Sequence, residues 1–247
     1  TISLGDKMKN VNWLKKEKIA HRGLFDNSKH IYENTLEAFN LALEHNYAIE
    51  MDIQLTLDNE IIVFHDKDLK RFFNIDKRVS QTRYEEFIEL GKNGLKAPLF
   101  KDVLHHVNGQ KPLLIELKAF KDYKLLVDKT MQELNSYKHP YALFSFDPRV
   151  VYYLKKKYPC VIRGQITSSF KDDKMSPFVK FMMKRMITNK LTQPDFISYD
   201  IKDLPNKYAD RAFKKGLVVI SFTARNKDEF YFIRKSYHNV VFENFRP

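Results

Sequence analysis

The chain has 247 residues, of which 43% are apolar, and its 43 basic and 31 acidic residues give a formal net charge of +12. Its 20 Phe and 13 Tyr exclude a disordered chain, because disordered segments are poor in aromatic and other apolar residues. The single cysteine, Cys160, excludes an internal disulfide and argues against a zinc site built from cysteines.

Short apolar runs alternate with amphipathic helical patterns from the start of the chain. A strand over residues 18–21 precedes a helix that a capping box at Asn34 opens and that runs to about His45. Strands over residues 48–55 and 61–65 follow, and the stretch between them is too short for a helical crossover.

The same alternation continues to the end of the chain. One helix opens at Thr82 and ends at Gly91, a second has Asp147 as its N-cap, and a third covers residues 207–215 and ends at Gly216. The remaining strands are predicted at residues 113–118, 141–146, 161–166, 195–199, 217–222 and 240–243.

Strands that alternate with helices are typical of a parallel sheet, and this number of strands favours a closed (β/α)8 TIM barrel. A doubly wound sheet is the alternative, but no Gly-rich phosphate-binding turn supports it. Nine strands for eight places mean that one is wrong or lies outside the barrel. If residues 54–60 descend as extended chain, Asp52 and His65 reach the same rim. We expect a barrel that is slightly irregular between strands 2 and 3, with a short insert.

We predict one domain over residues 1–247, with residues 1–17 as an N-terminal lead-in, because no repeat or flexible linker interrupts the pattern. No apolar run reaches the length of about 18 residues that a membrane span requires. The predicted location is therefore cytoplasmic or peripheral to a membrane, and a leader or anchor before Thr1 is left open.

His21 and Arg22 directly follow the first strand. In a barrel the carboxyl ends of the strands face the active-site rim, where a histidine can act as acid or base and an arginine can hold phosphate. The alternative is a histidine bonded to backbone and an arginine in a surface ion pair. These two residues alone favour the alternative.

Glu50 and Asp52 alternate strictly with apolar residues in the strand over residues 48–55. This spacing places both carboxylates on one face of the strand. Barrel strands are buried on both faces, where two like charges are costly unless they bind a cation. Ligands that offer only oxygen favour Mg²⁺ or Ca²⁺ over zinc.

Two further strands end in polar residues. His65 follows the third strand, and Glu116 and Lys118 share a face at the end of the fourth. Singly, a structural histidine and an internal ion pair explain them. Together, four successive strand ends bring two histidines, three carboxylates, one Arg and one Lys to one rim. Phosphoryl transfer requires this set, because positioning and electrostatics provide most of its catalysis.

Several short motifs follow one another along the first half of the chain. They are His21-Arg22-Gly23, Glu33-Asn34-Thr35, Glu50-x-Asp52, Thr56-x-Asp58, His65-Asp66-x-x-Leu69-x-Arg71 and Glu116-x-Lys118. These motifs resemble those of the glycerophosphodiester phosphodiesterase family. The resemblance is dense over residues 18–118 and looser from Ser145 onward.

The resemblance implies a barrel of the phosphatidylinositol phospholipase C type and roles for individual residues. Glu50, Asp52 and Glu116 would bind one divalent cation, Ca²⁺ or Mg²⁺. His21 and His65 would be general acid and base. Arg22 would hold phosphate, Lys118 would lie near its oxygens, and Asn34 is a further substrate-binding candidate that a capping role also explains.

The predicted reaction is metal-dependent hydrolysis of glycerophosphodiesters to glycerol phosphate and an alcohol. The nucleophile is either a hydroxyl of the substrate or water, and the sequence does not decide between them. Two alternatives stay open: a phosphodiesterase directed to lysophospholipid or phospholipid at a membrane surface, and a non-catalytic protein that binds lipid head groups.

The positive charge favours anionic partners. Nucleic acid is the least favoured, because no DNA- or RNA-binding signature accompanies the charge. Residues 177–190 mix Phe and Met with Lys and Arg, a pattern typical of an outer barrel helix or of peripheral contact with an anionic membrane. We expect a glycerophosphodiester or lysolipid as substrate; for residues 177–190 the outer barrel helix is the favoured interpretation, and peripheral contact with an anionic membrane is the alternative.

Overall fold

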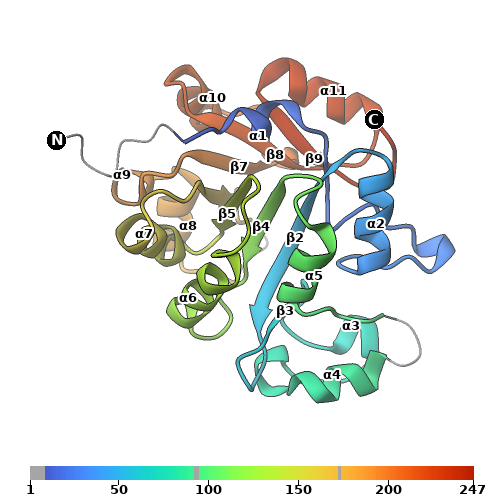
Figure 1. Ribbon diagram of the computed structural model, residues 1–247. Helices are drawn as coiled ribbons and strands as arrows, with labels where there is room; N and C mark the ends of the chain where they lie inside the picture. The colour runs from blue at the N-terminus through green and yellow to red at the C-terminus, as the bar shows by residue number, and fades with distance from the viewer. Residues whose placement is uncertain (1–8, 92–94, 172–173) are drawn as a thin grey trace. The chain divides into compact units, whose positions relative to one another are not determined.

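A computed structural model describes residues 9–91, 95–171 and 174–247 of the chain (Figure 1). Residues 1–8 of the predicted lead-in lie outside the described residues. The chain divides into two compact units, which we call the middle unit (Ala20–Tyr141) and the terminal unit (the described residues up to Ile19 with Ala142–Pro247). The organisation as one domain stays a prediction.

The middle unit holds three neighbouring strands, with no helix between the first and second in chain order and several helices between the second and third (Figure 1). It begins with the end of the short strand β1 (Ile19–Ala20). Its other elements are η1 (Asn27–Lys29), α2 (Leu36–Glu44), β2 (Ala48–Leu55), β3 (Ile61–Val63), α3 (Lys70–Phe73), η2 (Val79–Gln81), α4 (Tyr84–Leu90), α5 (Phe100–Val107), β4 (Leu113–Leu117) and α6 (Tyr123–Leu134).

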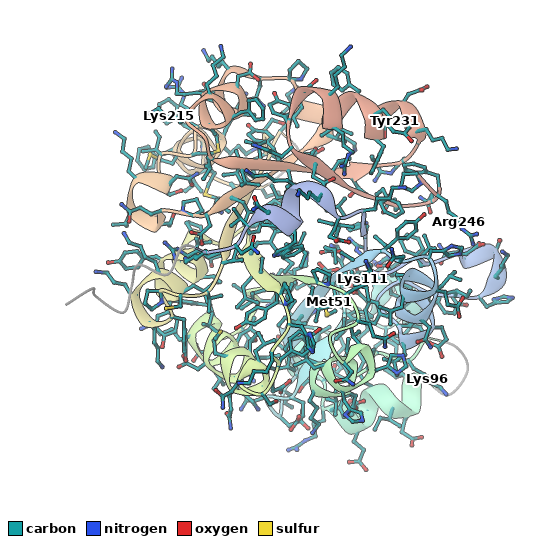
Figure 2. The ribbon with its side chains drawn as sticks, turned by 45° about the horizontal axis from the view of Figure 1, so that its top comes forward. Met51, Lys96, Lys111, Lys215, Tyr231 and Arg246 are labelled. Carbon is teal, nitrogen blue, oxygen red and sulfur yellow. The ribbon has the colours of Figure 1, made fainter. Side chains whose placement is uncertain are left out.

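β2 provides the framework of the middle unit. All eight of its residues are buried, as expected of a barrel strand covered on both faces. β2 and β4 are parallel, and their register places Asp52 opposite Glu116. Met51, which is labelled in Figure 2, alternates with the acidic residues of β2 and is completely buried. The apolar side chains of β2 thus fix which face carries the carboxylates.

β3 corrects the predicted path between the second and third strands. It runs antiparallel to β2, with Ile53 opposite Val63. The chain reverses in a tight turn, in which Asn59 donates its N–H to the Thr56 carbonyl at 3.2 Å, instead of descending as extended chain. A hairpin needs only a short turn, whereas a parallel return needs a longer connection. Asp52 and His65 still come close, because the returning strand passes β2 beside Asp52.

The segment between β3 and α5 is the predicted short insert. It contains α3, η2 and α4. Its own small hydrophobic cluster includes Phe64, Leu69 and Phe87, and the Phe64 and Phe87 rings meet edge to face at 5.8 Å between centroids. The insert is therefore packed against β3 by apolar contacts.

The terminal unit follows the same alternation, with parallel pairs from β5 to β9. Asp147 caps α7 and Gly216 follows α10 in the left-handed conformation (φ 81°), as predicted. Its elements are α1 (Asn12–Lys16), β5 (Tyr141–Ser145), α7 (Pro148–Lys157), β6 (Arg163–Thr167), α8 (Pro177–Lys184), α9 (Asn189–Thr192), β7 (Phe196–Asp200), η4 (Ile201–Asp203), α10 (Lys207–Lys214), β8 (Val218–Ala224), α11 (Lys227–Ser236) and β9 (Asn239–Phe242).

The described residues contain nine strands, each within two residues of its predicted bounds. Setting aside the antiparallel β3 leaves eight, and with the helices between them the fold is a (β/α)8 TIM barrel, as predicted. The extra strand of the sequence pattern is therefore β3. Among the described helices, none has the length and apolar character needed to cross a bilayer.

Candidate active site

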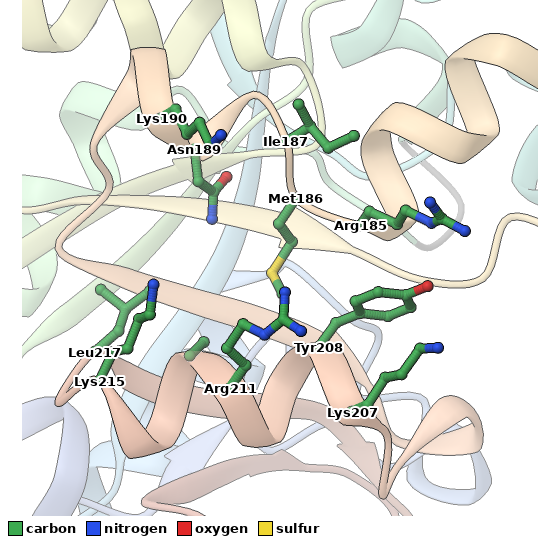
Figure 3. A pocket seen from close by; sticks show the side chains of 11 residues that line it. Arg185, Met186, Ile187, Asn189, Lys190, Lys207, Tyr208, Arg211, Lys215 and Leu217 are labelled. Carbon is green, nitrogen blue, oxygen red and sulfur yellow. The ribbon is translucent and has the colours of Figure 1, made fainter.

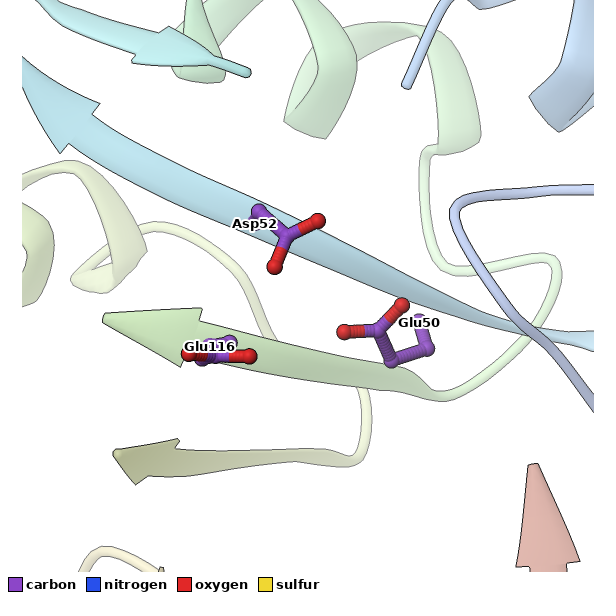
Figure 4. Close-up of side chains that lie close together, drawn as sticks. All are labelled: Glu50, Asp52 and Glu116. Atoms are coloured by element: carbon purple, nitrogen blue, oxygen red, sulfur yellow. The ribbon is translucent and has the colours of Figure 1, made fainter. Parts of the chain in front are cut away.

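Three carboxylates from β2 and β4 meet in the interior of the middle unit (Figure 4). Glu50, Asp52 and Glu116 each offer an oxygen, and these oxygens lie within 4.8 Å of one another. All three side chains are buried. The period-two spacing in β2 and the parallel register of β4 together bring them to one place.

Two cations partly balance this cluster. The Lys118 Nζ lies 3.0 Å from Asp52 Oδ1 and 2.7 Å from Glu116 Oε1. The Arg22 Nε lies 3.2 Å from Asp52 Oδ2, an ion pair without the alignment of a hydrogen bond. The Arg22 backbone N–H donates to Glu50 Oε2 at 2.9 Å. Three carboxylates thus face two cations, one of which is shared with Glu33.

The pKa values of the cluster show how this charge is distributed. Burial, together with Asp52 and Glu116, raises the pKa of Glu50 well above its ordinary value. Burial also raises the pKa of Glu116. Burial acts against ionisation of Asp52 as well, but Lys118 and His65 hold its pKa well below the ordinary range. Asp52 is therefore the carboxylate of the three that ionises most readily, and full ionisation of all three costs free energy.

These three carboxylates fit a hard divalent cation. They supply only oxygen, which Mg²⁺ and Ca²⁺ prefer, and a cation would offset the repulsion that raises the pKa of Glu50. Coordination by three side chains leaves positions for oxygens of a substrate.

Both predicted histidines lie beside the carboxylate cluster. The His21 Nε2 is 4.0 Å from Glu50 Oε2, and the charged forms of His21 and His65 both lower the pKa of Asp52. The His65 Nδ1 lies 2.7 Å from Asp66 Oδ1. When Nδ1 carries the proton and donates to Asp66, the Nε2 of neutral His65 is an acceptor for a proton.

Asn34 contacts the cluster directly and does not cap the helix, so its predicted role as a helix cap is wrong. Its Nδ2 donates to Asp52 Oδ2 at 2.9 Å, and its side chain is buried. The N-cap of α2 is the next residue, Thr35, whose Oγ1 accepts from the Ala38 N–H at 3.3 Å. Asn34 has a left-handed backbone (φ 57°), which Asn tolerates better than most residues.

Gly23 lets the loop after β1 lie close to α2. Its φ is +79°, and a Cβ there would come within 2.8 Å of the Ala38 backbone. This close approach allows the Asn34 N–H to donate to the Arg22 carbonyl at 2.9 Å. The glycine thus fixes Arg22 and Asn34 beside the same carboxylates.

The model of the glycerophosphoryl diester phosphodiesterase family matches residues 21–245. The chain belongs to this family. The match begins at His21 and includes every residue of the cluster.

Relatives and solved structures of the family agree with the fold. The Bacillus subtilis protein YhdW is 32% identical over 160 residues, which cover 60% of this chain and 65% of that protein. The chain thus matches less than two thirds of the length of its curated relatives.

Two solved structures cover more of the chain. A glycerophosphodiester phosphodiesterase of Thermotoga maritima is 24% identical, has a TM-score of 0.70, and covers 91% of this chain and 92% of its own. A phosphodiesterase of Oleispira antarctica, solved in complex with the product sn-glycerol-3-phosphate, is 19% identical, has a TM-score of 0.76, and covers 94% of both chains. At these identities the likeness shows the barrel fold.

Three charged residues that received no role from the sequence connect Arg22 to His65 in this family member. The Glu33 carboxylate accepts from Arg22 Nη1 at 2.6 Å and from Arg71 Nη2 at 2.6 Å. Arg71 also donates to Asp66 through Nε at 2.6 Å and Nη2 at 2.9 Å. Asp66 in turn holds His65. We call this chain of ion pairs the Glu33–Arg71–Asp66 network.

The network keeps its carboxylates ionised. Although burial alone would raise their pKa values, Arg71 and Arg22 lower the pKa of Glu33, and His65 and Arg71 lower the pKa of Asp66. Glu33, Asp66 and Arg71 all occur in the motifs that resemble the family, which is the signal that could have identified them. The pairing with Glu33 could not be read from the sequence, because Glu33 precedes α2 whereas Asp66 and Arg71 lie in the segment after β3.

We expect Asp66→Asn to lower kcat by about 10- to 100-fold with little change in KM, because His65 loses the carboxylate that orients it. Steady-state kinetics with a soluble diester would measure this effect. Asp68→Asn is the matched control, since the Asp68 carboxylate accepts the Lys70 backbone N–H instead. An equal loss in both variants would show a general effect on the loop.

Proposed function

We propose that the protein hydrolyses glycerophosphodiesters to glycerol phosphate and an alcohol, with one divalent cation, Ca²⁺ or Mg²⁺. The observation that carries this proposal is the buried group of Glu50, Asp52 and Glu116, whose oxygens lie within 4.8 Å of one another. Membership of the family supports the reaction class. The product bound to the Oleispira antarctica phosphodiesterase supports glycerol phosphate as the group that the site releases.

The three carboxylates would hold the cation. When bound, it would neutralise phosphate charge and polarise the phosphorus–oxygen bonds. Arg22 and Lys118 would hold the remaining phosphate oxygens, Arg22 through its forked guanidinium and Lys118 as a point charge. Burial alone would lower the pKa of Lys118, but Asp52 and Glu116 raise it, so Lys118 remains a cation.

His21 and His65 would move the protons. One accepts a proton from the nucleophile, and the other donates a proton to the leaving alkoxide. The nucleophile is either a glycerol hydroxyl of the substrate, which gives a cyclic phosphate that water then opens, or water itself. Both routes use the same residues. The hydrogen bond between His65 Nδ1 and Asp66 sets the ring so that Nε2 is the working nitrogen.

Chelation of divalent cations tests the proposal most directly. We expect release of glycerol phosphate to stop in chelator and to return when Ca²⁺ or Mg²⁺ is added in excess, because the carboxylate cluster repels substrate phosphate without a cation. A coupled assay for glycerol phosphate gives the rate, and separate additions identify the effective metal. Undiminished turnover in fully chelated protein contradicts the proposal.

A substrate panel separates this function from its alternatives. Preference for soluble glycerophosphodiesters supports the proposal, while preference for lysophospholipid presented in vesicles supports the membrane-directed alternative. Binding of head groups without turnover identifies a non-catalytic protein. A cytoplasmic or peripheral location stays a prediction.

A further inference from the structure

The terminal unit contains a cavity of about 720 Å³ between α10 and the segment that joins α8 to α9 (Figure 3). Five basic residues line it, and no carboxylate is among its lining residues. Apolar parts of Met186, Tyr208 and Leu217 form part of its wall. We call this the cationic pocket. Its five basic residues are Arg185, Lys190, Lys207, Arg211 and Lys215.

Within the part of the chain that the structure describes, no carboxylate lies within ion-pair distance of these five cations. The acidic residue of α10 is engaged elsewhere, because Asp210 accepts from the Tyr237 hydroxyl at 2.6 Å. Asp203, just before α10, accepts from the Ser169 N–H. Five like charges around one concave site create a positive potential that favours an anionic ligand.

An exposed apolar surface adjoins the cationic pocket. Phe178 and Phe181 of α8 are 71% and 44% exposed, and Leu191 of α9 is 58% exposed. The Arg185 guanidinium lies 3.9 Å from the centre of the Phe181 ring, so one residue joins the pocket to the apolar surface. α8 ends at Lys184, and Met186 takes a left-handed conformation (φ 53°). The predicted helical stretch 177–190 is thus broken, and the break forms one wall of the pocket.

We propose that the cationic pocket and the apolar surface of α8 and α9 form a docking site for membranes that contain anionic phospholipid. A phosphate head group enters the pocket, and Phe178 and Phe181 enter the boundary between head groups and acyl chains. Interfacial segments combine bulky apolar anchors with Lys and Arg in this way. The cavity is within the size range of sites for small organic ligands and is larger than inorganic phosphate requires.

A membrane fits these residues better than a nucleic acid does. Single-stranded nucleic acid is bound by aromatic platforms on which bases stack. Here aliphatic side chains, Val179 (43% exposed) and Leu191, accompany the two phenylalanines, and acyl chains cover such groups while bases do not. Binding to a membrane does not depend on the proposed hydrolysis, so each can fail without the other.

Vesicle flotation with the full chain tests the docking site. The wild-type protein is expected to float with phosphatidylcholine vesicles that contain phosphatidylglycerol and to stay behind with pure phosphatidylcholine. The double variant Lys207→Ala with Arg211→Ala should weaken binding about 25-fold, because each basic residue near an anionic surface contributes about fivefold. Adding Phe178→Ser to this double variant should weaken vesicle binding further, because the substitution removes an apolar anchor.

Two controls on α11 match these variants in charge and apolar character. Lys227→Ala with Lys235→Ala removes the same charge from exposed positions, and Tyr231→Ser removes an aromatic side chain that is 58% exposed. Both should bind vesicles as the wild type does, and all variants should keep the wild-type melting temperature and turnover of a soluble diester.

Three results would overturn the docking site. One is unchanged vesicle binding by the pocket variants. The second is an equal loss in the α11 controls, which assigns binding to net charge alone. The third is binding of a single-stranded oligonucleotide, but not of vesicles, that depends on Lys207 and Arg211.

Discussion

Glu50→Gln is expected to lower kcat/KM by about 10²- to 10³-fold, because it removes one carboxylate ligand of the cation that stabilises charge in the transition state. The same substitution should leave the metal-free protein at least as stable as the wild type. Glu50 is the carboxylate whose pKa burial and two acidic neighbours raise. Glutamine keeps its shape without the charge.

The pH dependence of stability shows whether the Glu50 carboxylate destabilises the metal-free protein. A carboxyl whose pKa is raised in the folded state holds its proton more tightly there than in the unfolded chain. The free energy of unfolding of the metal-free protein therefore falls as pH rises above the ordinary pKa of Glu toward the raised value. Glu50→Gln should reduce this fall, which thermal melts in chelator at several pH values would measure.

Metal-induced stabilisation separates a ligand from a merely structural residue. Added Ca²⁺ or Mg²⁺ should raise the melting temperature of the wild type and have a much smaller effect on Glu50→Gln, because ligand binding stabilises only the state that binds. The exposed Glu44 at the end of α2 provides the control substitution Glu44→Gln. If Glu50→Gln and wild type respond equally to metal, Glu50 is not a ligand.

His21→Ala and His65→Ala are each expected to reduce kcat by about 10²- to 10⁴-fold, because each removes a general acid or base. The two losses should differ with the leaving group. A diester with a nitrophenol leaving group needs no proton from the enzyme, so it should restore the rate of the variant that lacks the acid. It should not restore the rate of the variant that lacks the base.

Comparing the two variants on the two substrates therefore assigns the roles. His106→Ala is the control, since the His106 ring pairs with Asn40 on the adjacent helix α2. Rates within about twofold of wild type for both His21→Ala and His65→Ala would contradict the two-histidine mechanism.

The carboxylate cluster could be predicted from the sequence for a simple reason. Alternation along β2 fixes the face of Glu50 and Asp52, and neighbouring parallel strands in register bring Glu116 to the same level. The strand order of a barrel follows the chain, so adjacent motifs become adjacent side chains. Hydrophobic pattern and topology alone determine this part of the site.

Other parts of the site depend on information that the pattern does not contain. The predicted direction of β3 was wrong, because an apolar run has the same composition whether it lies parallel or antiparallel to its neighbour. Asn34 and Thr35 are both good caps, and only the left-handed turn at Asn34 decides which one caps α2. The break at Met186 has no glycine or proline to announce it.

The Glu33–Arg71–Asp66 network connects the insert to the orientation of His65. Arg71 belongs to α3, and its guanidinium lies 4.1 Å from the centre of the Phe72 ring, which packs against the hydrophobic cluster of the insert. The small core of the insert therefore fixes the position of Arg71. Arg71 in turn holds Asp66, and Asp66 holds His65. A change that shifted this small core would displace Asp66, and with it His65, without altering any residue of the reaction centre.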